Sequence, residues 1–381
     1  MRIAMIHSFY RDGGVSGENR VVLDQFRILE EAGHVVQLFA QETSKPTSGW
    51  YPFKTGISLI TGRGRDPSSA ITKFKPDVVH VQNLFPNFST QWVSDWPGPV
   101  VASIHNFRWG CSNGTFYRNG SVCVECRSHG DRRAVQYGCY RNSRTATIPV
   151  AATRARDRKN VLERAQVVVA TSELMARLLS SLLSEHLRIC VVPNFVTQLG
   201  TPISQKGVTK TPKKWLAAGR FTPEKGFLEL VYDWPGSREL TLIGDGEQAQ
   251  EIRKVAQVRG IRVLGPRSRE DLRGLMMDAI GLIFPSRWFE VDPQIVAEAL
   301  SLGVPVIAFG GSASAELIEI SGAGSTYSDR ESLLEALDYV TRERDQLSKT
   351  ALDVASKIWT PSVWLDAIEA VYARAQATYT Q

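Results

Sequence analysis

Short apolar runs alternate with polar loops and with segments of helical periodicity along most of this chain. Such runs, bounded by turn residues, are typical of strands buried on both faces of a parallel sheet, and the periodic segments between them are typical of crossover helices. The pattern therefore predicts an α/β fold. In the first half the predicted strands cover residues 2–6, 35–40, 76–83, 100–104, 167–170 and 187–192, with a possible short strand at 57–60.

The same pattern restarts in the second half of the chain. It follows a segment at 197–214 that is rich in Thr, Pro, Gly, Ser and Lys and has no apolar period, as is typical of a linker. Predicted strands then cover 215–218, 240–243, 261–264 and 279–284, and predicted helices cover 268–277 and 361–379. The hydrophobic pattern thus favours two α/β domains, the first of which ends near residue 196.

Length and composition agree with two globular domains. The chain has 381 residues, of which 43% are hydrophobic and 22% charged, and these are ordinary values for globular proteins. The first apolar run is too short for the core of a signal peptide, and no later run approaches the roughly 18 residues of a membrane span. We therefore expect a cytoplasmic protein.

The formal net charge of +6 is unevenly distributed. Residues 127–164 contain ten Lys or Arg and three Asp or Glu, and six of the basic residues fall in a predicted helix at 143–165. This surface could contact an anionic membrane, a nucleic acid or an anionic acceptor, or it could be an ordinary solvated face. The helix is the candidate for contact with the inner face of a cell membrane.

A polar loop separates the strand at 279–284 from a helix predicted to begin near Pro293. Glu290 lies in this loop, and Glu298 lies eight residues later, in the first turns of the helix. A helix N-terminus favours an anion, and a carboxylate near it can accept hydrogen bonds from a pair of hydroxyls. The stretch could hold a molecule that carries both phosphate and sugar, although a βαβ unit with two solvated glutamates would show the same pattern.

Two cations bracket a tight glycine loop after the strand at 215–218. Arg220 and Lys225 lie five residues apart in the sequence GRFTPEKG. An Arg fork and a Lys point charge can neutralise a departing diphosphate without a catalytic metal. A solvated pair of surface charges is the alternative.

Other candidate residues follow predicted strands. Gly13 and Gly14 follow the first strand, and Gly246 follows the strand at 240–243. Glycines let a backbone approach a ligand closely, although Gly13 and Gly14 do not form a dinucleotide fingerprint and could belong to a plain turn. His105 follows the strand at 100–104, where it could also be an ordinary hydrogen-bonding histidine.

Together, Glu290-x7-Glu298, the sequence GVPVI at 303–307 and the loop GRFTPEKG resemble the signature of the retaining GT-B glycosyltransferases of family 4, the glycosyl transferases group 1. The resemblance implies two Rossmann-like domains that face each other across a cleft. Residues 1–196 would form the acceptor domain and 197–360 the nucleotide-sugar donor domain, with a terminal helix at about 361–381 that crosses back to the first. Where the family commonly has Gly after the first Glu, this chain has Val291.

The resemblance also implies a role for each candidate residue. Glu290 and His105 would contact the donor sugar, and Glu298 would accept hydrogen bonds from the ribose hydroxyls. The remaining assignments are Arg220, Lys225, Gly13 and Gly14 to the diphosphate and Gly246 to the base or ribose. No Asp or Glu is an obvious covalent nucleophile, and the family is thought to use front-face attack in which the leaving phosphate takes the acceptor proton.

A cysteine-rich insertion interrupts the α/β pattern at about 108–140. It contains Cys111, Cys123, Cys126 and Cys139, in the spacing C-x11-C-x2-C-x12-C. Four thiolates can close a tetrahedral zinc site in a segment that has little core of its own. Free thiols, disulfides and an iron–sulfur site remain alternatives, although a cytosolic compartment disfavours disulfides.

The sequence therefore predicts a retaining glycosyltransferase that moves a sugar from a UDP- or GDP-sugar to a glycan, a glycolipid or a small molecule, in cell-surface polysaccharide or glycoconjugate biosynthesis. A nucleotide-sugar epimerase of the same architecture is the nearest alternative. A zinc-containing nucleic-acid-binding protein, suggested by the basic segment and the CxxC, is a more remote one. We expect no nucleic-acid partner.

Overall fold

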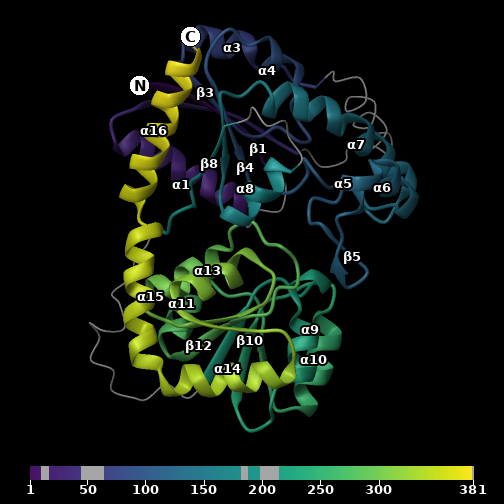
Figure 1. Cartoon of the computed structure of the whole chain (residues 1–381), viewed down its shortest axis with the longest axis vertical. Coiled ribbons are helices and arrows are strands. Elements are labelled where there is room, and N and C mark those ends of the chain that lie inside the picture. The colour runs from purple at the N-terminus through teal and green to yellow at the C-terminus, as the bar shows by residue number, and fades with distance from the viewer. Residues whose placement is uncertain (10–16, 44–63, 182–187, 198–213, 380–381) are drawn as a thin grey trace. The chain divides into compact units, whose positions relative to one another are not determined.

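The computed structural model describes residues 1–9, 17–43, 64–181, 188–197 and 214–379. The chain divides into two compact units (Figure 1). Unit 1 comprises residues 1–116, 123–194 and 364–381, and unit 2 comprises residues 117–122 and 195–363. The possible strand at 57–60 and nearly all of the linker at 197–214 lie outside the described residues.

Unit 1 is built on a six-stranded parallel sheet in the order β2-β1-β3-β4-β7-β8. The interiors of β1, β3, β4 and β7 are fully buried, as the continuous apolar runs predict. The strands are β1 (Arg2–Phe9), β2 (Val35–Glu42), β3 (Val78–Asn83), β4 (Val100–Ile104), β7 (Val167–Ala170) and β8 (Ile189–Val191).

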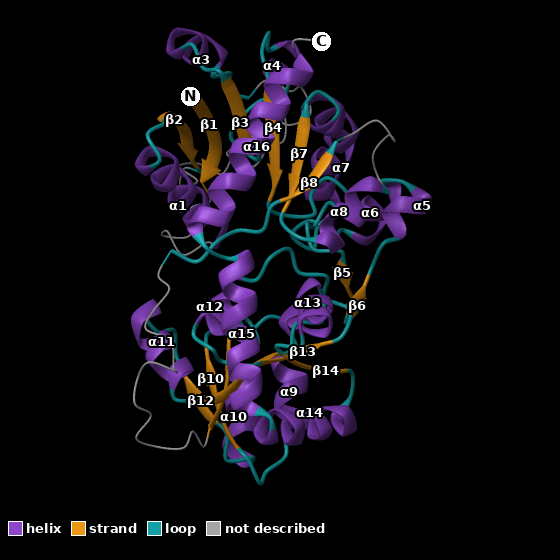
Figure 2. Cartoon of the chain, turned by 60° about the vertical axis from the view of Figure 1, so that its left-hand side comes forward, coloured by secondary structure: helices purple, strands orange, loops and turns teal. Residues whose placement is uncertain are grey.

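Helices flank this sheet. The C-terminal helix α16 (Pro361–Tyr379) lies against it, and the Tyr372 hydroxyl is 2.8 Å from Nδ1 of His80 on β3 (Figure 2). The other helices of unit 1 are α1 (Gly17–Glu31), α3 (Ser68–Phe74), α4 (Gln91–Asp95), α5 (Glu125–His129), α6 (Arg132–Tyr137), α7 (Arg144–Asp157) and α8 (Glu173–Ser180).

Helix α7 forms most of the segment 143–165, for which the sequence predicts a helix apart from Pro149. It contains Pro149, and it passes at Arg158–Leu162 into a turn of π-helix, which is wider than an α-helical turn. The Thr153 hydroxyl donates to the carbonyl of Pro149 at 3.1 Å. Helix α7 therefore continues past Pro149 to Asp157, where the wide turn begins.

The segment between β4 and α7 carries the four clustered cysteines. It forms a two-stranded antiparallel hairpin, β5 (Tyr117–Arg118) and β6 (Ser121–Val122), followed by α5 and α6. None of the four forms a disulfide bond with another described cysteine. Among the described residues, no group of three or more His, Cys, Asp or Glu side chains is placed to hold a metal ion, so the structure gives the zinc prediction no support.

Unit 2 contains a second six-stranded parallel sheet, in the order β11-β10-β9-β12-β13-β14. Alternate residues of each strand enter different cores: on β9, Leu216 packs on one face and Trp215 and Ala217 on the other. The strands are β9 (Lys214–Ala218), β10 (Glu239–Ile243), β11 (Arg262–Leu264), β12 (Ala279–Phe284), β13 (Val306–Phe309) and β14 (Gly324–Tyr327).

Helices cover both faces of this sheet, which explains why its central strands β9, β12 and β13 are mostly apolar. Their bounds are α9 (Phe227–Asp233), α10 (Ala249–Val258), α11 (Arg269–Met277), α12 (Gln294–Ser301), α13 (Ala313–Ser321), α14 (Arg330–Arg342) and α15 (Arg344–Ile358). In the part of the chain that the structure describes, no helix has the length and apolar character needed to cross a bilayer.

Candidate active site

The strand order of unit 2 places its candidate residues at one point. In chain order the sheet reads 3-2-1-4-5-6, so the direction of winding reverses between β9 and β12. Ligands of open parallel sheets bind outside the carboxyl ends of the strands at such a reversal. The loop with Arg220 and Lys225 follows β9, and the loop with Glu290 follows β12.

Lys225 and Glu290 meet at this reversal point. The Lys225 ammonium lies 2.5 Å from Oε1 of Glu290, and the Ser286 hydroxyl donates to the same oxygen. The Lys225 ammonium also lies 5.3 Å from the centre of the Trp288 ring. Both charged side chains are largely buried, with exposed fractions of 17% for Lys225 and 5% for Glu290. Partial burial strengthens such a pair relative to one on the surface.

The backbone around this pair is constrained. Glu290 has φ = 51°, a left-handed conformation that is uncommon for a residue other than glycine. Gly226, which follows Lys225, has φ = 68°, and a Cβ there would lie 2.1 Å from the carbonyl oxygen of Pro285. Only glycine fits that approach, which brings the Lys225 loop against the loop after β12. Strained backbone of this kind clusters at functional sites.

Arg220 differs from Lys225 in its surroundings. Its side chain is 71% exposed, and its nearest carboxylate is Glu224 at 3.8 Å. Such a loose surface pair contributes little to stability. Arg220 can therefore turn toward an anionic ligand without giving up a strong internal contact.

Glu298 lies on α12 and is already hydrogen-bonded. Arg269, the first residue of α11, donates from Nε at 2.7 Å and from Nη2 to the same oxygen, Oε1. The sequence reasoning missed Arg269, because nothing in the local pattern of α11 marks it. Both hydrogen bonds reach Oε1 and hold the carboxylate in place.

If Glu298 binds the ribose, Glu298→Ala should weaken nucleoside diphosphate binding by about 1–3 kcal/mol, the cost of unpairing a charged hydrogen bond. Calorimetry with the cognate diphosphate measures this loss. Glu270→Ala, next to Arg269 on α11, is a matched control and should bind as the wild type does. Unchanged affinity in a folded Glu298→Ala protein would remove Glu298 from the site.

Gly246 has a structural reason to be glycine. It has φ = 156°, and a Cβ would lie 2.5 Å from the carbonyl oxygen of Phe221. Packing against the chain's own backbone therefore requires glycine here, whether or not a base or ribose lies nearby.

Unit 1 has a corresponding polar cluster. Its strand order, 2-1-3-4-5-6 in chain order, reverses between β1 and β3. Glu18, in the first turn of α1, accepts a hydrogen bond from Asn83 at the end of β3 at 2.7 Å, and Asn106 after β4 lies 3.5 Å from its other oxygen. Removal from water raises the pKa of the Glu18 carboxyl, and the two amides act against that rise. The sequence reasoning missed Glu18.

His105 lies beside this cluster, within a buried network. Its Nε2 is 2.5 Å from Oε1 of Gln82, whose amide donates to Gln25 at 2.9 Å. Since the Gln oxygen can only accept, the hydrogen bond places the imidazole proton on Nε2 and leaves Nδ1 as an acceptor. Burial, together with His7 and His80 nearby, lowers the pKa of His105 to about 3. The ring is neutral at physiological pH.

Glu18 leads to a prediction about stability. Because its pKa is raised in the folded state, the stability that it contributes is greatest at low pH and is lost as pH rises through the folded-state pKa. Glu18→Gln, which cannot ionise, should therefore melt at a higher temperature than the wild type, with a difference that grows from pH 5 to pH 8. Melting curves across this range measure it, with the exposed Glu30→Gln of the same helix as control. A Glu18→Gln protein that melts below the wild type at pH 8 would contradict the assignment.

The structure says less about the remaining predicted residues, which are Gly13, Gly14 and the four clustered cysteines. Gly13 and Gly14 lie outside the described residues. In the cysteine segment, burial raises the pKa of the Cys126 thiol, and the Arg154 guanidinium nearby acts against that rise. A thiol with a raised pKa is a poor ligand until a metal ion displaces its proton.

Two Rossmann-like sheets, each with a polar cluster where its winding reverses, are typical of α/β enzymes that bind nucleotides. Two family models match the chain: Glycosyltransferase Family 4 over residues 15–197 and Glycosyl transferases group 1 over residues 212–343. The chain belongs to this glycosyltransferase family, whose fold is GT-B. The protein is a glycosyltransferase, which by family retains anomeric configuration and depends on a nucleotide sugar.

Solved structures show the same fold. Sucrose-phosphate synthase from Thermosynechococcus elongatus matches with a TM-score of 0.70 at 17% identity, over 99% of each chain. The lipopolysaccharide outer core galactosyltransferase WaaB matches with 0.64 at 15%, over 98% of this chain and 100% of that one. HepE from Anabaena, in complex with UDP, matches with 0.59 at 16%, over 98% and 100%.

One curated relative also matches, the exopolysaccharide phosphotransferase SCO2592 of Streptomyces coelicolor. It is 28% identical over 218 residues, 51% of this chain. This chain spans about a fifth of that relative's length, 22%.

Proposed function

We propose that the protein transfers a sugar from a UDP- or GDP-sugar to a glycan, glycolipid or small-molecule acceptor in cell-surface polysaccharide or glycoconjugate biosynthesis. The observation that carries the donor part is the contact between Lys225 and Glu290 at the reversal point of the second sheet. The similarity to WaaB and to an exopolysaccharide phosphotransferase supports the biosynthetic context. The UDP bound in HepE supports a nucleotide donor.

In this proposal unit 2 holds the donor. Arg220 and Lys225 bind the diphosphate, whose negative charge grows as the bond to the sugar breaks. Glu290 accepts hydrogen bonds from the sugar hydroxyls, and Glu298 accepts them from the ribose. Lys225 holds Glu290 in place through an oxygen that Ser286 also contacts, so the carboxylate is oriented before the donor arrives.

Unit 1 holds the acceptor. Glu18, Asn83 and Asn106 present one carboxylate and two amides at the carboxyl edge of the sheet, a set suited to sugar hydroxyls. His105 is neutral and acts as a hydrogen-bonding group toward the donor sugar, as the family resemblance implies. The leaving phosphate takes the acceptor proton, so the protein contributes positioning and electrostatic stabilisation.

A donor screen followed by a transfer assay tests the proposal. Nucleoside diphosphates are compared by thermal shift, because a ligand that binds only the folded state raises its stability. The sugar conjugates of the best nucleotide are then incubated with and without glycan and lipid acceptors. Acceptor-dependent release of diphosphate, with the anomeric configuration kept, is expected. Conversion of the donor with no acceptor present would favour the alternative, an epimerase of the same architecture.

Because the chain belongs to this glycosyltransferase family, we set aside the alternative of a zinc-containing nucleic-acid-binding protein. Contact with an anionic membrane at the cytoplasmic face stays a proposal, which rests on the exposed Arg144 and Lys159; Arg154 of the same segment is buried and paired with Asp131, so it cannot take part.

The zinc prediction is tested directly. If Cys111, Cys123, Cys126 and Cys139 form a site, tag-free protein should contain about one zinc per chain, and its removal should destabilise the cysteine segment without entering the transfer step. Elemental analysis measures the metal. Absence of metal, together with four thiols that alkylate freely in the folded protein, would retire the idea.

A further inference from the structure

A cavity of about 70 Å³ lies within unit 1, next to the cluster around Glu18. Asn83, which holds Glu18, contributes to the cavity wall, together with the loop that follows β3, with Arg108 and with α7. The cavity is several times larger than the space needed for one water molecule. It therefore adjoins the proposed acceptor site and has room for a small polar group.

Guanidinium groups dominate the charge of the cavity wall. Arg108, Arg154 and Arg156 all line it, and the described lining contains one carboxylate, Asp157. Arg154 pairs with Asp131, which is not part of the lining. Arg108 packs its guanidinium 4.4 Å from the centre of the Phe85 ring, and its charge acts on the Glu18 carboxyl, which is not part of the lining. The wall thus carries excess positive charge.

Several guanidinium nitrogens here have no protein partner. Nη1 of Arg108 and both Nε and Nη1 of Arg154 are buried without a described hydrogen-bond partner, although the Arg154 guanidinium as a whole also meets Asp131 and Cys126. The Arg154 side chain is only 4% exposed. Burial lowers the pKa of Arg154, yet an arginine stays charged under all ordinary conditions. A buried donor without an acceptor is costly, and its presence beside a cavity indicates a ligand that supplies the acceptor.

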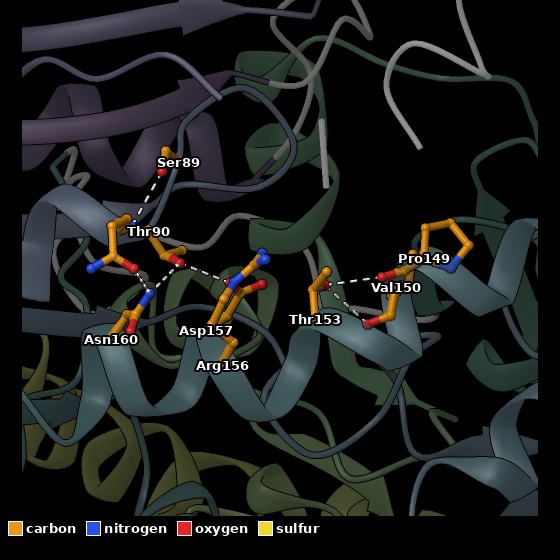
Figure 3. A network of polar contacts seen from close by, with 9 residues as sticks. Ser89, Thr90, Pro149, Val150, Thr153, Arg156, Asp157 and Asn160 are labelled. Carbon is orange, nitrogen blue, oxygen red and sulfur yellow. Dashed lines mark hydrogen bonds and ion pairs between the residues drawn. The ribbon is translucent and has the colours of Figure 1, made fainter. Parts of the chain in front are cut away.

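Asp157 does not neutralise the other lining arginines, because it already pairs with Arg156 and accepts a hydrogen bond from Thr90. The Thr90 hydroxyl donates to Oδ1 of Asp157 at 2.8 Å, and Nη2 of Arg156 lies 3.3 Å from the same oxygen (Figure 3). Asn160 donates to the Thr90 hydroxyl at 3.2 Å, which fixes the loop that bears Thr90. The remaining cation of the lining is Arg108, whose charge acts on the Glu18 carboxyl outside the lining.

We propose that this cavity binds a phosphoryl group of the acceptor. This inference rests on the proposed function for its acceptor. Guanidinium forks match phosphate oxygens. One arginine can satisfy a planar carboxylate, whereas a tetrahedral phosphoryl group offers acceptor oxygens in more directions and can use two arginines. The phosphoryl group would accept from Arg108 and Arg154, and the attached sugar or glycerol would extend past Asn83 toward Glu18.

Inorganic phosphate is the probe, titrated calorimetrically against chloride at matched ionic strength. Arg108→Gln should weaken phosphate binding by about tenfold or more, the effect of losing a charged hydrogen bond. Arg132→Gln, an exposed arginine of α6, is the matched control and should leave affinity unchanged. If Arg108→Gln fails to fold, Arg154→Gln serves as the second variant.

The donor loop could also bind phosphate, so the titration is repeated with Arg220→Ala/Lys225→Ala protein. Phosphate binding that persists there and falls in Arg108→Gln supports the cavity. Binding that is lost with the donor-loop change, or that ignores both cavity arginines, overturns it. Because the titration needs no sugar transfer, a failed transfer assay with phosphate binding that depends on Arg108 would refute the proposed function alone.

A second arm identifies the source of the phosphoryl group. Glycerol 3-phosphate represents soluble acceptors, and vesicles of phosphatidylglycerol in phosphatidylcholine represent lipid ones. Binding of glycerol 3-phosphate that Arg108→Gln weakens indicates a soluble phosphomonoester. Vesicle binding that Arg108→Gln weakens and Arg132→Gln does not indicates a lipid-linked phosphodiester. If Arg108→Gln weakens neither, the acceptor phosphate assignment is overturned.

Discussion

Arg220→Ala is expected to lower the turnover number by on the order of a hundredfold or more, because one donor to a developing oxyanion contributes roughly 2.7–4 kcal/mol of transition-state stabilisation. The folded protein should be almost unaffected. Arg220 is mostly exposed, and its 3.8 Å contact with Glu224 is a loose surface pair. Steady-state kinetics and a melting curve on the same preparation separate the two effects.

Lys225→Ala should cost a comparable amount in rate but should also lower stability. Lys225 lies 2.5 Å from the buried Glu290, and its removal leaves that carboxylate with a hydroxyl partner alone. An uncompensated buried charge is strongly destabilising. A melting temperature that falls in Lys225→Ala and not in Arg220→Ala is therefore expected.

The double variant tests whether the two cations share one diphosphate. Since both act on one charge, their effects on the rate should not be additive. A coupling energy near zero would mean that they bind different ligands. The same design implies no catalytic magnesium, so activity should survive excess chelator, provided that any structural zinc is retained. A strict magnesium requirement would count against it.

Glu290→Gln should lower turnover strongly while the affinity for free nucleoside diphosphate stays near the wild-type value. Free diphosphate carries no sugar, so it does not sample the contact that Glu290 makes in the transition state. The amide that replaces the carboxylate would keep an oxygen for Lys225 and Ser286, so the loop should keep its shape. Kinetics with the sugar donor and calorimetry with the diphosphate provide the two readings.

Ser286→Ala is the matched control for Glu290→Gln. It removes one hydrogen bond to Glu290 without changing the charge, so its effect on turnover should be much smaller. If diphosphate affinity falls together with turnover in Glu290→Gln, the residue acts on the nucleotide and its assignment to the sugar is wrong.

The sheets were largely predictable from the sequence. The strands at 100–104, 167–170 and 279–284 have the predicted bounds, because each is a continuous apolar run bounded by polar residues. The helix predicted at 268–277 begins one residue later, with Ser268 as its N-cap. The segment 143–165 was predicted to be helical apart from Pro149; Pro149 lies inside α7, and the turn at Arg158–Leu162 is π-helical, which periodicity does not distinguish from an α-helix.

The site was less predictable because its contacts depend on strand order. The motifs mark Lys225 and Glu290 separately, yet their contact arises because β9 and β12 are neighbours, which no local pattern states. Arg269 and Glu18 were missed for the same reason. A signal for Glu18 did exist, since Asn83 and Asn106 both end predicted strands and required a partner at the start of a nearby helix.

The number of residues in the π-helical turn at Arg158–Leu162 affects the contacts beside the proposed acceptor site, in addition to the identity of the side chains there. Asp157 enters this turn and Asn160 lies within it, and both contact the Thr90 hydroxyl. A π-helical turn spans one residue more per hydrogen bond than an α-helical turn, so deleting one residue there would tighten it to regular α-helix and displace the residues of the turn itself, Asn160 among them. Homologous chains that differ there by one residue would support Thr90 differently, because Asn160 holds its hydroxyl, while the α7 residues that line the cavity all precede the turn.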